Sequence, residues 1–182
     1  MDSLKTCLAG VILWLPLLLT ATADEGGKLI ERKPPGREPT NDKEFLVWAV
    51  ACEVAEGKFA EKAVKNANDP DVRKMAQKVL DDHKKLQDAL LEQAKKLKVA
   101  VVEGLEKHHR AEYDKLAKLD GRAFDQEYLR YLVEGHEKGV EMYKKWAKDA
   151  KDADLREVAE RGVTTAREHL GQAKKLQERL KK

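Results

Sequence analysis

The sequence predicts an all-α protein: a four-helix bundle with a short extra helix in the crossover between the second and third long helices. Two observations lead there. Charged residues make up 38% of the chain and aromatic residues only 5%, a balance typical of helical proteins. Four long segments also repeat apolar residues every three or four positions, as helices with one buried face do. The 36 basic and 33 acidic residues are interspersed, which gives no footprint for nucleic acid.

The first 42 residues are expected to lie outside the bundle. Lys5 precedes an apolar run of about 12 residues, too short to span a bilayer core of ~30 Å comfortably, and Ala21-Thr22-Ala23 has the small-residue pattern read by signal peptidase. We therefore expect a signal peptide over residues 1–23, export to the periplasm or cell envelope, and no stable membrane insertion after cleavage; an uncleaved anchor is the alternative. Residues 24–42 are rich in Gly, Pro and charge, which predicts a disordered linker.

The bundle is expected over residues 43–182, and its first helix should begin near Asn41 or Asp42, either of which can cap it. At about 100° per residue, Glu56 points into the apolar stripe of this helix, whereas Glu53 lies toward its edge. Glu56 is therefore the predicted buried carboxylate. Cys52 falls on the stripe and is expected to be in the core.

The second helix should start at Asp69-Pro70, with Asp as cap and Pro at the first helical position. Its apolar face includes His83. Glu56 and His83 lie about 13 and 14 residues from the turn, which places them at nearly the same height in an antiparallel hairpin.

A connection too long for a simple hairpin follows, with a short helix predicted over 106–118. His108 and His109 are adjacent there and cannot both face the core, so they are expected at the surface.

The last two long helices each place one histidine on an apolar face. His136 stands where a leucine would be expected in the helix after Gly121, and His169 does so in the helix from about 152. Asp125, near the start of the third long helix, is expected to interact with the helix dipole. Their distances from the intervening turn place His136 and His169 within about 6 Å in height.

One carboxylate and three imidazoles in one layer, Glu56, His83, His136 and His169, indicate either a metal site or a metal-free hydrogen-bonded network. This donor set suits zinc, or copper or iron where a coordination position stays open. The carboxylates of a di-iron centre are missing, because Leu80, Val133 and Ala166 stand three residues before the histidines.

Three runs resemble the DUF4142 family of bacterial envelope proteins, whose fold is a ferritin-like helical bundle. They are Ala76 to His83, Gly121 to Leu129 leading to His136, and His169-Leu170. The resemblance covers roughly 43–176 and implies fold and compartment rather than activity. It also implies that Glu56, His83, His136 and His169 match the recurrent polar positions of the family, with Glu53 competing with Glu56. Thr164 stands where the family often has a proline.

Three functions remain open from the sequence. The first is an exported bundle that binds a transition metal (zinc, iron or copper) through the four polar residues. The second is a structural or interaction module whose buried Glu-His network fixes helix register. The third, an enzyme, ranks last, because no nucleophile triad or phosphate-binding loop is visible and a substrate pocket is not indicated. The sequence leaves protein partners and oligomeric state open.

Overall fold

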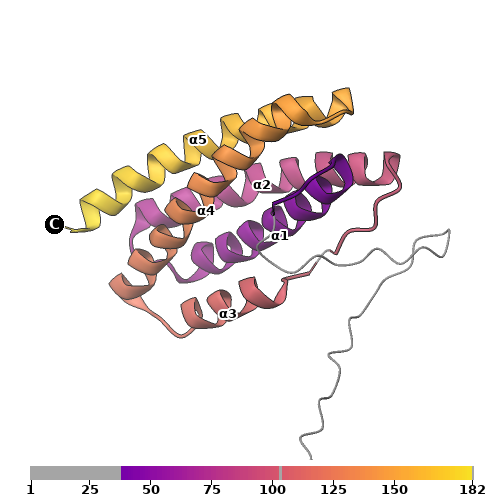
Figure 1. The fold of residues 1–182 in the computed structure, drawn as a ribbon. Helices are drawn as coiled ribbons and strands as arrows, with labels where there is room; N and C mark the ends of the chain where they lie inside the picture. The colour runs from indigo at the N-terminus through magenta and orange to yellow at the C-terminus, as the bar shows by residue number, and fades with distance from the viewer. Residues whose placement is uncertain (1–37, 103, 182) are drawn as a thin grey trace, which may run out of the picture. The chain divides into compact units, whose positions relative to one another are not determined.

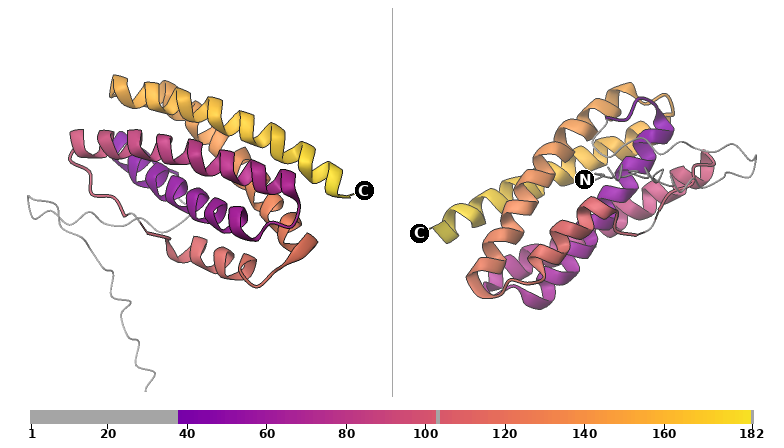
Figure 2. Two further views of the ribbon diagram at one scale, coloured as in Figure 1. Left: turned by 180° about the vertical axis from the view of Figure 1, so that it is seen from behind. Right: turned by 60° about the horizontal axis from the view of Figure 1, so that its bottom comes forward.

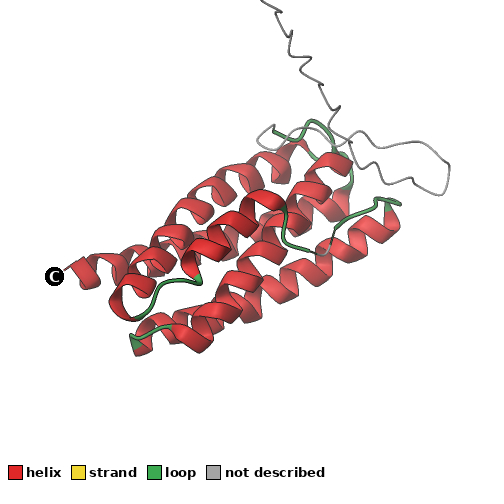
Figure 3. Cartoon of the chain, turned by 90° about the horizontal axis from the view of Figure 1, so that it is seen from below, coloured by secondary structure: helices red, strands yellow, loops and turns green. Residues whose placement is uncertain are grey.

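The computed structural model describes residues 38–102 and 104–181, and the described chain is helical (Figure 1). The predicted bundle is confirmed, with a short helix in the crossover. The predicted signal peptide and most of the predicted linker lie outside the described residues. The described part has five helices joined by loops and no strand (Figure 3), with these bounds: α1 Asp42–Asn66, α2 Pro70–Lys96, α3 Lys107–Leu116, α4 Gly121–Asp149 and α5 Ala153–Lys181.

The four long helices form two antiparallel pairs. We call α1 and α2 the first hairpin and α4 and α5 the second hairpin; the two lie side by side (Figures 1 and 2). The short helix α3 runs along the outside of the bundle, where Tyr113 meets Phe59 of α1 edge to face at 5.5 Å. No helix in the described ranges is long and apolar enough to cross a membrane.

The starts of α1 and α2 follow the predicted capping chemistry. The Asn41 side chain accepts a hydrogen bond from the backbone N–H of Glu44 at 3.1 Å, and Asp69 accepts from the N–H groups of Asp71 and Val72 with Pro70 at the first helical position. These caps fix where each helix begins, and therefore the height of the residues that follow.

Each hairpin also supplies a carboxylate that accepts hydrogen bonds from the turn of the other hairpin. The Asp125 carboxylate on α4 accepts the backbone N–H groups of Asn68 and Asp69 in the α1–α2 turn, at 2.9 and 2.8 Å. The Asp42 carboxylate on α1 accepts those of Lys151 and Asp152 in the α4–α5 turn, at 3.0 and 2.9 Å. The expected role of Asp125 was therefore incomplete: it reaches across the bundle to a turn 56 residues away.

These reciprocal contacts reflect an internal repeat at a separation of 83 residues. Asp42 and Asp125 stand in this register, as do Asp69 and Asp152. Arg73 and Arg156 do so as well, and each guanidinium donates at 2.6 Å to the carbonyl at the end of the helix that precedes its own, Ala67 or Ala150. Equivalent residues therefore make equivalent contacts in the two hairpins.

Two apolar clusters fill the bundle, one toward each end. One is built around Phe45, Leu90 and Trp146, and the other around Phe59, Val79 and Phe124. Along every long helix, the buried ionisable residues at the middle fall between these clusters, so the polar layer is enclosed by apolar packing on both sides.

Candidate metal centre

Three buried histidines from three helices converge at the middle of the bundle. His83 (α2), His136 (α4) and His169 (α5), which we call the histidine layer, have at most 5% of their surface exposed. Their ring centroids are 5.3 Å apart in each of the three pairs. One nitrogen of each ring faces the centre: His83 Nε2 lies 3.2 Å from His136 Nε2, which lies 3.3 Å from His169 Nδ1. The sequence prediction that these histidines share one layer is confirmed.

The outer nitrogen of each ring has an acceptor. His83 Nδ1 lies 2.7 Å from Glu53 Oε2, His136 Nδ1 lies 2.8 Å from the carbonyl of Leu132, and His169 Nε2 lies 3.1 Å from Asp82 Oδ2. A carbonyl accepts but does not donate, so the proton of a neutral His136 is on its outer nitrogen. The carboxylates favour the same tautomer for the other two rings.

With the outer nitrogens protonated, the inner lone pair of His136 faces that of His83 at 3.2 Å and that of His169 at 3.3 Å, and one nitrogen of each ring lies within 4.8 Å of the other two. Acceptors facing acceptors repel unless a cation or a proton lies between them. An orienting carboxylate or carbonyl behind each imidazole is also the usual arrangement around metal-bound histidines, because it fixes the ring and raises the basicity of the ligand.

The pKa shifts of the three histidines favour protonation of one imidazole, His83, and disfavour protonation of the other two. Burial opposes charging of His83, but the adjacent Glu53 carboxylate outweighs it through its charge and hydrogen bond, so the pKa of His83 is raised. Burial, together with a charged His83, holds the pKa of His136 well below its ordinary value and lowers that of His169 to about 4. In the absence of metal, a single proton on His83 therefore satisfies the layer best.

The carboxylate that hydrogen-bonds to the layer is Glu53, and the predicted buried carboxylate, Glu56, is buried as well. Glu53 is 2% exposed, and its second oxygen accepts the hydroxyl of Tyr143 at 2.6 Å. The prediction that Glu53 lies toward the edge of the buried stripe is wrong, because α1 has neighbours on several sides and its buried positions extend well beyond one stripe. The 83-residue register was the signal that could have found Glu53, since it stands 83 residues before His136.

Glu56 is buried one helical turn further along α1, and its Oε2 has no hydrogen-bond partner among the described residues. Burial raises its pKa to about 8, despite the opposing effect of His83. Its other oxygen lies where a side chain at Gly135 would be, since a Cβ built on Gly135 would be 2.6 Å from it. The backbone beside His136 is therefore open to this carboxyl group.

Asp82 connects the layer to the surface, and the sequence analysis did not single it out. Burial is opposed by hydrogen bonds from Lys78 at 2.7 Å and from His169, and the pKa of Asp82 falls to about 2. Its side chain is 24% exposed, whereas that of His169 is fully buried. Its position directly before His83 hid it, because adjacent helical residues point about 100° apart.

The remaining predicted positions lie away from the centre. Cys52 is half-buried with a free thiol, and His109 is half-buried on α3. Thr164, at the position where the family often has proline, donates to the carbonyl of Glu160 at 3.2 Å within an unbroken α5. That helix therefore delivers His169 to the layer without a proline.

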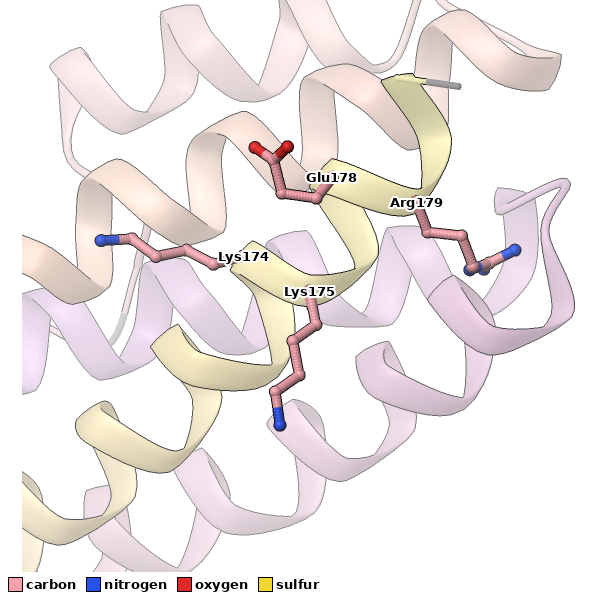
Figure 4. Close-up of a pocket in the computed structure, with 4 residues that line it drawn as sticks. All are labelled: Lys174, Lys175, Glu178 and Arg179. Carbon is pink, nitrogen blue, oxygen red and sulfur yellow. The ribbon is translucent and has the colours of Figure 1, made fainter.

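A surface hollow near the end of α5 offers no comparable chemistry. Its four side chains spread outward from the helix rather than converging (Figure 4). Lys174 pairs with Glu137 at 2.7 Å and Arg179 with Asp69 at 2.7 Å, so much of its positive charge is already neutralised. The convergent donors of the described chain are those of the histidine layer.

Fold and centre together define a helical bundle with a buried three-histidine cluster backed by acidic residues. A family model described as a domain of unknown function, DUF4142, matches residues 31–176, and the chain belongs to this family. No curated protein shows a significant sequence match.

Several solved structures share the fold. CopM in the Cu(II)-bound form has a TM-score of 0.67 at 18% identity, over 77% of this chain and 97% of that one. CopM in a silver-bound form has a TM-score of 0.65 at 17% identity, over 78% and 98%. A DUF305 fragment from Deinococcus radiodurans has a TM-score of 0.68 at 14% identity, over 79% and 99%. At these identities the likeness is one of fold.

Proposed function

We propose that this protein binds a transition metal ion through His83 Nε2, His136 Nε2 and His169 Nδ1. The observation that carries the proposal is that three buried nitrogen lone pairs face one another while each outer nitrogen is held by an acceptor. A cation at their centre turns mutual repulsion into three favourable bonds. A metal ion binds the unprotonated imidazole nitrogen, so binding would release the proton of any protonated His83.

The spacing of the nitrogens supports an ion of ordinary size. Ligands 2.0–2.1 Å from an ion at tetrahedral angles lie about 3.3 Å from one another. Two of the three separations in the layer, 3.2 and 3.3 Å, are close to this value.

Copper is the ion we propose first among zinc, iron and copper. Imidazole nitrogen suits all three, but nitrogen sites hold Cu(II) more tightly than the other divalent ions of the first row. Support also comes from CopM, a structural neighbour that occurs in copper- and silver-bound forms.

Glu56 is the candidate for the remaining ligand position or for charge compensation. It is buried beside the layer, its Oε2 has no described partner, and burial keeps it neutral near pH 7. A cation in the layer favours its ionised form, so we propose that Glu56 loses its proton when metal binds.

We further propose that the protein acts outside the cytoplasm, as a sequestering or buffering protein of the cell envelope. The support is the N-terminal apolar run with its small-residue cleavage pattern.

The test is to equilibrate the untagged chain with Cu(II), Cu(I) or Zn(II), remove free ion, and measure metal content and thermal unfolding. We expect one ion per chain and, with free ion at 100 times the Kd, about 2.7 kcal/mol of added stability. His136→Gln should abolish both effects, whereas His109→Ala, altered on α3, should keep both. Wild type without bound metal, or equal binding by His136→Gln, would refute the proposal.

The second candidate is a structural module with a metal-free network. The raised pKa of His83 favours it, because a protonated His83 donates to both Glu53 and His136. This candidate predicts that metal changes neither stability nor composition, while removal of Glu53 or His83 destabilises the bundle. The metal experiment therefore separates the two.

A further inference from the structure

We propose that Tyr143 is a redox-active tyrosine, oxidised by one electron with transfer of its proton to Glu53, and that Trp48 connects it to the surface. This goes beyond metal binding, and it can be tested in the metal-free protein.

The hydrogen bond gives the phenolic proton a destination. Oxidation of a phenol to a neutral radical requires loss of its proton, so a carboxylate already bonded to the hydroxyl makes the step easier. Tyr143 donates to Glu53 Oε1 at 2.6 Å inside the core, within the range of a charge-assisted O–H···O⁻ bond. The electron goes to a soluble outer-sphere oxidant, a high-potential metal complex that accepts one electron, and the proton goes to Glu53, which leaves a neutral phenoxyl radical and a carboxylic acid.

Other tyrosines lack such a partner. Tyr128 is fully buried and its hydroxyl has no hydrogen-bond partner among the described residues, so its oxidation would leave a proton with no base to accept it. Tyr113 and Tyr131 are in ring contact with Phe59, and no described hydrogen bond joins either hydroxyl to a carboxylate. Tyr143 is therefore the tyrosine equipped for proton-coupled oxidation.

A ring contact joins Tyr143 to the edge of the bundle. The Tyr143 ring lies 6.0 Å from Trp48, centroid to centroid, in an edge-to-face arrangement, and Trp48 is half-buried. Trp146, by contrast, is 3% exposed and its indole N–H has no described partner. Electrons can therefore pass between the surface and Tyr143 through the half-buried Trp48.

The radical would form next to the histidine layer. Glu53 bonds Tyr143 through one oxygen and His83 through the other, so one carboxylate links the phenol to an imidazole of the layer. Tyr143 can thus carry oxidising equivalents away from the buried imidazoles and toward Trp48.

The test uses metal-free full-length chain in a Tyr113→Phe background, which removes the half-buried tyrosine. Photogenerated tris(bipyridine)ruthenium(III) serves as the one-electron oxidant, and tyrosyl radical is followed by absorbance and electron paramagnetic resonance. We expect Tyr143→Phe to remove the radical signal and Tyr128→Phe, a matched loss of one buried hydroxyl, to retain it.

Two further variants test the roles of the neighbours. Glu53→Gln keeps the size of the side chain but accepts the proton poorly, so we expect radical formation to slow by about tenfold or more. Trp48→Phe should slow it as well, without changing the final position of the radical. Circular dichroism establishes that each variant is folded.

An unchanged radical yield in folded Tyr143→Phe, or unchanged kinetics in folded Glu53→Gln, would overturn the proposal. Neither result bears on whether the layer binds metal, because no metal is present in the experiment.

Discussion

The two hairpins share their outer contacts and differ in what they bring to the centre. Asp42 and Asp125 close equivalent turns 83 residues apart, yet in the same register α1 carries Glu53 where α4 carries His136. The first hairpin supplies both orienting carboxylates and one histidine of the layer, and the second supplies two histidines and Tyr143. The outer contacts are thus equivalent in the two hairpins, whereas at the centre the first hairpin forms an acidic side, with Glu53 and Asp82, and the second contributes two of the three imidazoles.

The largest expected effect comes from the reciprocal caps. Asp125 is 1% exposed, so Asp125→Ala removes a buried carboxylate and leaves two backbone N–H groups of the α1–α2 turn without their acceptor, which should cost about 3 kcal/mol. Asp42→Ala removes the equivalent contact at a half-buried position and should cost about 1 kcal/mol. Urea unfolding of both variants measures the difference; equal losses would show that burial does not distinguish the two caps.

The orienting carboxylates test the acidic side of the centre. Glu53→Gln should weaken metal binding by about 10- to 100-fold, because it removes the charge behind His83 within the core. Asp82→Asn should weaken it by less than about tenfold, since water can reach the half-buried position behind His169. Competition titration with a metal indicator gives both values, and a larger effect of Asp82→Asn would reverse our assignment of the stronger orienting group.

The pH dependence of the free energy of unfolding distinguishes Glu56 of the first hairpin from His169 of the second. The pKa of Glu56 is raised to about 8 in the folded chain. Its contribution to the free energy of unfolding is therefore fully present at pH values below its ordinary pKa near 4.5 and is lost as pH rises through 8. The pKa of His169 is lowered to about 4 in the folded chain. Its contribution to the free energy of unfolding is therefore present at pH values above its ordinary pKa near 6.5 and is lost as pH falls through 4.

Relative to Glu56→Gln, the metal-free wild type should therefore lose about 2 kcal/mol of unfolding free energy between about pH 5 and pH 8. Glu92→Gln, a change at an exposed position on α2, is the control and should follow the wild type. Parallel curves for wild type and Glu56→Gln would show that Glu56 ionises as freely in the bundle as in the unfolded chain.

The smallest expected effects concern two helical glycines. A Cβ at Gly162 would lie 2.5 Å from the Tyr143 ring, so Gly162→Ala should destabilise the second hairpin by about 1 kcal/mol or more. A Cβ at Gly57 meets nothing within 4 Å, so Gly57→Ala should stabilise the first by about 0.8 kcal/mol through helix propensity. Thermal unfolding checks both signs, and a stable Gly162→Ala would mean that Tyr143 can move without loss.

Most of the fold, the convergence of the three histidines and the burial of Glu56 could be predicted from the sequence. Helix spacing and the Asp69-Pro70 start signal place His83 in the core, and distances from the turns bring His136 and His169 to its height. Glu53 was misplaced because a single-stripe argument assumes one buried face, whereas α1 is covered on several. Asp82 and Tyr143 were missed because their roles come from contacts between helices, which no spacing along one helix contains.

The crossed carboxylates also bear on how the chain folds. The backbone N–H groups of each turn find their carboxylate acceptor only when the opposite hairpin has packed against them. These contacts join residues 56 and 110 positions apart in the sequence. An isolated hairpin therefore has a frayed turn, and the two halves gain their last hydrogen bonds in the same event. Such coupling favours folding in a single cooperative transition, with half-assembled bundles too short-lived to accumulate.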